Sequence, residues 1–241
     1  MRKGKKGFTL IELMIVIAII AIIAAIAIPG LLSSQRASNE RNASTSLKTL
    51  SSAEADFRAN DRDWNHVNDF WTANVAGLYT MTSAAVTGAT ANSTTDPSIK
   101  LIELSVASAD TDATAISAGT ENLALTNFAV SSAKAGYWYM ALATDLTLSG
   151  SAESTYKIDT GGTPTMGTVH NTSKFGFMSF PDSQSAGKYV FIVNENNTIF
   201  RSATSGAVRT GTTNPPGLIT TPQYANWPND ASLKSFWSKL D

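Results

Sequence analysis

Glu12 is the acidic residue of a long apolar run near the start of the chain, and it poses the first chemical question of the sequence. The run extends from Phe8 to Leu32, and no polar side chain occurs between Leu13 and Ile28. A carboxylate costs on the order of 2 to 3 kcal/mol in a membrane helix. An acid inside such a run is therefore a candidate functional residue whose partner has to be found.

Two acidic patterns further along the chain could bind a metal ion, but each is incomplete. Asp61, Asp63 and Asn65 begin like a calcium loop, yet the Gly and Glu that such a loop needs later are missing. Asp110 and Asp112 could bind calcium in an exposed loop. We expect a solvated turn at the first pattern and assign no metal site and no cofactor.

Residues for nucleophilic catalysis are equally sparse. Ser131 and Lys134 fit an S-x-x-K pattern, but the companion motifs of that enzyme class are absent. His66 and His170 lie in polar contexts typical of surface residues, so neither is a good candidate for the histidine of a Ser-His-Asp site. The five tryptophans could form a sugar platform, although packing in a core is their more frequent role. We therefore do not expect an enzyme.

Composition excludes further classes of function. The chain has 241 residues, a net charge of −1 and 15% charged residues, so no basic surface is available to neutralise the phosphates of a nucleic acid. Cysteine is absent, which excludes disulfides and thiolate metal sites. The length suits one domain with an appendage, or two small domains.

The residues around the apolar run indicate how it would sit in a membrane. Four positive charges precede it: Arg2, Lys3, Lys5 and Lys6. By the positive-inside rule this end stays in the cytoplasm, and a helix over 8–32 is long enough to cross a hydrocarbon core of about 30 Å. A signal peptide cleaved near 25–27 and a plain membrane anchor are the alternatives, although neither explains Glu12.

The stretch KGKKGFTLIELMIVIAIIAIIAAIAIP, from Lys3 to Pro29, resembles the N-terminus of type IV prepilins and type II secretion pseudopilins. In that family a short basic leader ends in Gly and is followed by Phe, Thr, Leu, Ile, Glu and a long apolar helix. The match has no gap, and the Gly, Phe and Glu all fall where the family has them.

The resemblance implies a role for each matching residue. Gly7 would end a leader that the prepilin peptidase removes, and Phe8 would become an N-methylated N-terminus. Glu12 would pair with the α-amino group of a neighbouring subunit as a filament grows. Since a carboxylate and an ammonium are each costly in lipid, the pairing would remove both penalties. Pro29 matches the family's helix-breaking proline and predicts a kink or a local unwinding upstream of it.

The same resemblance implies partners and a location. We expect a homo-oligomeric filament, the prepilin peptidase, an inner-membrane assembly platform and, before assembly, membrane lipid. The chain would cross the bacterial inner membrane once with a cytoplasmic N-terminus, and its globular domain would be periplasmic or extracellular. The choice between a type II secretion pseudopilus and a surface type IV pilus stays open. The alternative from another class is a membrane-tethered or secreted β-rich binding module that does not polymerise.

Hydrophobic periodicity predicts the elements that position these residues. An apolar stripe at helical spacing continues after Gly30: Ala43, Leu47, Leu50, Ala53 and Phe57. We therefore expect one kinked helix over 8–58 that is transmembrane in its first half and lies on a sheet in its second half. With 1–7 as leader and 59–241 as exported domain, the predicted class is α+β, a pilin-like long helix packed on an antiparallel β-sheet.

The exported domain is expected to be rich in strands. A short helix is predicted over 68–80 and an exposed loop over 81–98. Strands are predicted at 101–106, 122–130, 137–143, 154–158, 174–180 and 188–193. The last strand should form a hairpin with residues 198–202. A proline-rich tail should end in a short helix that Asp230 caps, with a docking face at helical spacing: Leu233, Phe236, Trp237 and Leu240.

Overall fold

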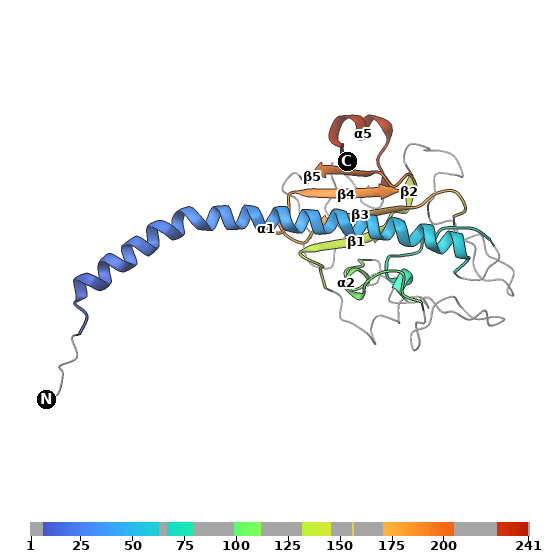
Figure 1. Ribbon diagram of the computed structural model, residues 1–241. Coiled ribbons are helices and arrows are strands. Elements are labelled where there is room, and N and C mark those ends of the chain that lie inside the picture. The colour runs from blue at the N-terminus through green and yellow to red at the C-terminus, as the bar shows by residue number, and fades with distance from the viewer. Residues whose placement is uncertain are drawn as a thin grey trace.

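The structure is a computed structural model, and it describes residues 7–62, 67–79, 99–111, 132–145, 156, 171–204 and 226–240. Its helices are α1 (Leu10–Asn60), the 3-10 helix η1 (Ala76–Tyr79), α2 (Leu104–Ala107) and α5 (Asp230–Phe236). Its strands are β1 (Tyr137–Ala141), β2 (Thr144–Asp145), β3 (Gly176–Pro181), β4 (Tyr189–Asn194), β5 (Ile199–Ala203), β6 (Asn226–Trp227) and β7 (Ser238–Leu240). Figure 1 shows the N-terminal half of α1 extending away from a domain built on a sheet.

The long helix predicted over 8–58 is confirmed as α1, which has 51 residues. Its second half packs on β3, β4 and β5. All five predicted stripe residues are buried, and Leu47, Leu50 and Phe57 are 0% exposed. Because burial of one such Leu or Phe side chain contributes roughly 1.5 to 3 kcal/mol, the stripe fixes this half of the helix on the sheet.

α1 continues through Pro29 without unwinding. Pro29 has no N–H to donate to the carbonyl of Ala25, which removes one helical hydrogen bond. One turn later the hydroxyls of Ser33 and Ser34 donate to the Gly30 carbonyl at 2.8 and 3.0 Å. Figure 1 shows the helix curving gradually along its N-terminal half. Of the two predicted outcomes, local unwinding is therefore wrong, and the bend is spread over several turns.

The predicted antiparallel sheet is confirmed, with strand order β1-β3-β4-β5-β7. β1, β3, β4 and β5 coincide with runs predicted as strands, and β4 and β5 form the predicted hairpin. Asn197 in its turn has a φ of 54°, a left-handed conformation that asparagine tolerates better than most residues. A separate pair, β2 with β6, is parallel.

The sheet carries a hydrophobic cluster on each face. The α1 stripe packs with Phe177, Phe191 and Val193 in the larger cluster. Met178, Val190 and Ile192 belong to the other cluster. Neighbouring residues of β3 and β4 thus alternate between the clusters, as the pleat of a strand requires.

Two predictions between residues 68 and 106 are wrong. The run 101–106 is not a strand, because Leu104–Ala107 form α2, whose Val106 and Ala107 are buried and which packs against η1. The helix predicted over 68–80 is reduced to η1, Ala76–Tyr79. Residues before it are held in non-helical backbone by tertiary bonds, such as Phe70 N–H to the Asn171 carbonyl at 2.8 Å.

The C-terminal helix is shorter than predicted and has a different cap. Asn229, not Asp230, is the N-cap of α5, and its side chain accepts a hydrogen bond from Ser232 N–H at 2.9 Å. The helix ends at Phe236, and β7 then pairs with β5, where Leu240 lies opposite Ile199. Leu233 and Trp237 pack against the second cluster as the docking prediction requires, but Phe236 is 56% exposed.

Several predictions fall on residues outside the described ranges. They are the loop over 81–98, the strand over 122–130, the strand over 154–158 except Tyr156, and most of the proline-rich tail.

Candidate processing and assembly segment

The peptide between Gly7 and Phe8 lies in an open, non-helical segment directly before α1. Residues 7–9 carry no helical structure, and Phe8 is 90% exposed. No heavy atom lies within 4 Å of the position where a side chain on Gly7 would begin. A protease can therefore reach this peptide bond without unfolding any element.

Thr9 and Glu12 form a capping box that closes the first turn of α1. Thr9 N–H and the Thr9 hydroxyl donate to Glu12 Oε2 at 2.8 and 2.7 Å. In return Glu12 N–H donates to Thr9 Oγ1 at 3.4 Å. The box satisfies backbone donors that the first turn of a helix leaves without a partner. The signature T-x-x-E was visible in the sequence, but the sequence reasoning missed it.

The capping box fixes where the Glu12 carboxylate points. It is turned back toward residues 7–9, so Gly7, Phe8 and Glu12 lie within one turn of the same helix end. In the part of the chain that the structure describes, Glu12 Oε1 accepts no hydrogen bond. This second oxygen is available to a donor from outside the chain.

Pro29 lies away from this cluster. It is 17 residues after Glu12 on one continuous helix, which corresponds to about 26 Å along the axis. The structure therefore brings together Gly7, Phe8 and Glu12 and separates Pro29 from them.

The surface around Glu12 is apolar and uncovered. Among the helices of the described ranges, α1 is long and apolar enough to cross a membrane by length and composition, and none of its most apolar window is buried inside the molecule. Ile17, Ile20 and Ile23, for example, are 58 to 61% exposed. Such a surface requires either lipid or other apolar helices around it.

The other residues weighed for chemistry have structural roles or lie outside the described ranges. The Asp110 carboxylate is buried and accepts a hydrogen bond from Ala76 N–H at 2.7 Å. No group of three or more potential metal-binding side chains occurs among the described residues. Asp63, Asn65, Asp112, Ser131, His66 and His170 lie outside them.

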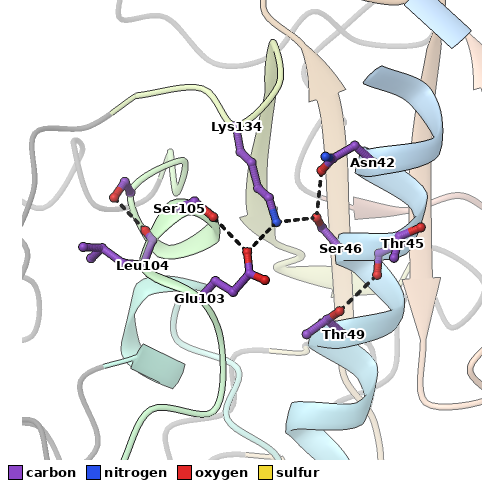
Figure 2. A network of polar contacts seen from close by, with 9 residues as sticks. Asn42, Thr45, Ser46, Thr49, Glu103, Leu104, Ser105 and Lys134 are labelled. Carbon is purple, nitrogen blue, oxygen red and sulfur yellow. Dashed lines mark hydrogen bonds and ion pairs between the residues drawn. The ribbon is translucent and has the colours of Figure 1, made fainter. Parts of the chain in front are cut away.

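Lys134 belongs to a polar network that ties α1 to α2 (Figure 2). Its Nζ atom lies 3.1 Å from Ser46 Oγ on α1 and 3.0 Å from Glu103 Oε2. The hydrogen bond from Lys134 holds the pKa of Glu103 below its usual value. The lysine of the S-x-x-K pattern is thus a link between segments.

Glu54 is a buried acid that the sequence reasoning did not single out. It lies on the buried face of α1, is 0% exposed, and its Oε2 accepts Trp71 N–H at 2.9 Å. Burial raises the pKa of Glu54 well above its usual value, the hydrogen bond from Trp71 opposes this shift, and the charge of Asp69 adds to it.

Comparison with protein families matches residues 2–28 to the prokaryotic N-terminal methylation motif. Comparison with curated proteins found no match, and neither did comparison with solved structures. The motif implies processing by prepilin peptidase, and pilin-like families are generally structural and non-enzymatic. Together with the apolar helix it indicates membrane anchoring before assembly. The chain therefore carries, at residues 2–28, an N-terminal methylation motif that is typical of type IV prepilin and pseudopilin families.

Proposed function

We propose that this chain is a structural subunit of a type IV filament, either a type II secretion pseudopilus or a type IV pilus. The observation that carries the proposal is the first half of α1, an exposed apolar surface that bears one carboxylate beside an accessible Gly7–Phe8 peptide. Polymerisation would cover this surface with the same surface of other subunits, and burial of apolar area would drive it.

Processing divides the chain into three parts in this proposal. Residues 1–7 are the leader, 8–58 the long helix, and 59–241 the exported domain. The peptidase cuts after Gly7 on the cytoplasmic side of the inner membrane, and the new α-amino group of Phe8 is methylated. The assembly platform in that membrane then adds the subunit to the filament.

Glu12 gives the assembly its register. Cleavage creates an ammonium on Phe8, and the Glu12 carboxylate of a neighbouring subunit is its partner. Because Thr9 occupies Glu12 Oε2, the ammonium binds at Oε1. Each charge is costly in an apolar surrounding when it is alone, and pairing removes both costs. The two groups meet only when the helices of neighbouring subunits are displaced along their axes by one particular distance.

N-terminal sequencing and intact mass of the protein purified from membranes test this proposal. We expect a chain that begins at Phe8 and is heavier than the unmodified sequence by one methyl group. A chain that begins near Ile28 would instead identify a signal peptide and a module that does not polymerise.

A pair of glycine variants sharpens the processing test. Gly7→Val should leave the leader in place, because the residue before the cut would become bulky and β-branched. Gly4→Val, in the same leader, is the matched control and should be processed normally. Equal processing of both variants would contradict cleavage after Gly7.

A further inference from the structure

A cavity of about 530 Å³ lies beside the second half of α1, on the domain and away from the N-terminal segment. Small side chains of α1, among them Ala55 and Ala59, form one wall and leave the space open. The remaining lining comes from Arg58, from Asn68 and Phe70, from Phe175, and from the β4–β5 turn. Its volume falls in the range of small-molecule sites, roughly 300 to 1,000 Å³.

Arg58 is held in this cavity by an aromatic ring. Its guanidinium carbon lies 4.8 Å from the centroid of the Phe70 ring, and Phe70 in turn packs on Phe175 with ring centroids 5.0 Å apart. Within the described ranges no acceptor takes a hydrogen bond from the Arg58 guanidinium. Contact with the ring restrains the guanidinium group, whose N–H groups can donate to a carboxylate on a ligand.

The β4–β5 turn supplies polar groups of a different kind. Glu195 and Asn197 line the cavity from this turn, and Asn68 lines it from the segment after α1. Asn197 N–H donates to the Asn194 carbonyl at 2.9 Å, which fixes the turn. Burial raises the pKa of Glu195, although nearby Lys174 opposes the shift. Amides and a carboxyl group can both donate to and accept from hydroxyl groups.

We propose that this cavity binds a short carbohydrate that carries a carboxylate, of the uronic-acid type. Arg58 pairs with the carboxylate, while Glu195 and the two asparagines bind hydroxyl groups. Phe70 and Phe175 are almost fully buried, and their part is to hold Arg58 in place at the wall of the cavity. A simple anion fits less well, because it offers no hydroxyl groups to Glu195 and the two asparagines. The proposal gives the domain a ligand of its own, beyond any role in a filament.

Titration of the full-length chain in detergent micelles tests this ligand class. The probes are glucuronate, glucose and acetate, and calorimetry or ligand-observed NMR measures binding. We expect glucuronate to bind about tenfold or more tightly than glucose, because a charge-assisted, bidentate pair is stronger than neutral hydrogen bonds. Acetate should bind more weakly than glucuronate.

Three outcomes of the titration would overturn the proposal. Equal affinity for glucose and glucuronate would remove the role of Arg58. Equal affinity for acetate and glucuronate would identify a plain anion site. Absence of glucuronate binding at millimolar concentration would show that the cavity does not take this class of ligand.

Two variants locate the binding with matched controls. Arg58→Gln should weaken glucuronate binding about tenfold and leave glucose unchanged, whereas Arg41→Gln, an exposed arginine on the same helix outside the cavity, should change neither. Ala55→Trp should fill the cavity and abolish binding, whereas Thr49→Trp, at an exposed position outside the cavity, should not. Retained binding in a folded Ala55→Trp chain, or an unchanged Arg58→Gln chain, would contradict the site.

Discussion

The two halves of α1 belong to one continuous helix but differ in what covers their apolar side chains. In the first half, the large apolar residues from Leu10 to Leu32 are between 42 and 76% exposed, and they point in all directions. In the second half, the five apolar stripe residues between Ala43 and Phe57 lie on one face and are at most 5% exposed. The second half is covered by the same chain, whereas the first half requires lipid or other apolar helices around it.

The largest difference between the halves should appear when one apolar side chain is truncated in each. Leu47→Ala removes a fully buried side chain and should lower the free energy of unfolding by about 2 to 5 kcal/mol. Ile20→Ala, in the first half, should change the stability of the domain by less than about 0.5 kcal/mol. Thermal unfolding of the full-length chain in micelles, followed by tryptophan fluorescence, measures both. Similar melting temperatures for the two variants would contradict the division of the helix.

A smaller effect is expected from Glu54, the acid on the buried half. Because its pKa is raised in the folded chain, the folded chain keeps a proton that the unfolded chain releases above about pH 4.3. The stabilising contribution of the protonated form is therefore complete below that pH and is lost as the pH rises through the folded pKa. Glu54→Gln keeps an oxygen that accepts Trp71 N–H and never becomes charged.

Melting temperatures at pH 5 and pH 8 check this expectation. Glu54→Gln should raise the melting temperature at pH 8 by at least about 2 °C and should have a smaller effect at pH 5. Glu40→Gln is the control, since Glu40 is only partly buried and accepts Lys188 N–H at the edge of the domain. An equal shift of the Glu54→Gln chain at both pH values would show that burial does not hold the proton there.

The smallest effect is expected at the start of the exposed half. Thr9→Val keeps the shape of the side chain but removes both hydrogen bonds of its hydroxyl, which should cost the first turn about 0.5 to 2 kcal/mol. Hydrogen exchange at the Glu12 amide should become several-fold faster, while Thr9→Ser should stay close to the parent. Unchanged exchange in Thr9→Val would mean that the capping box does not hold this turn.

Sequence reasoning recovered the parts of the fold that depend on local periodicity. The stripe from Ala43 to Phe57 and the strands β1, β3, β4 and β5 follow from spacing and side-chain type alone. The strand predicted over 101–106 was wrong because six mostly apolar residues fit a strand or a helix equally well. Contact with η1 favours the helix α2, and this contact cannot be deduced from the residues of the run alone.

The prediction of a helical C-terminus was wrong for a related reason. Phe236 and Leu240 stand at helical spacing, but β5 offers a free edge, and the last residues pair with it as β7. At the candidate site, Glu12 was found because it is chemically out of place, and its partner within the chain, Thr9, was missed. A threonine three residues before a glutamate is common at the start of a helix, so Thr9 does not stand out beside an apolar run.

In the proposed filament, Glu12 joins the exposed half of one α1 to the N-terminus of a neighbouring subunit. Electron microscopy of filaments from cells that carry only Glu12→Val measures it directly, with Ile15→Ala as a control at a neighbouring exposed position. We predict that Glu12→Val is cleaved after Gly7 and inserted in the membrane but yields at least about tenfold fewer filaments, because an ammonium left without its partner is strongly destabilising. Filaments in normal number from a fully cleaved Glu12→Val chain would contradict the account.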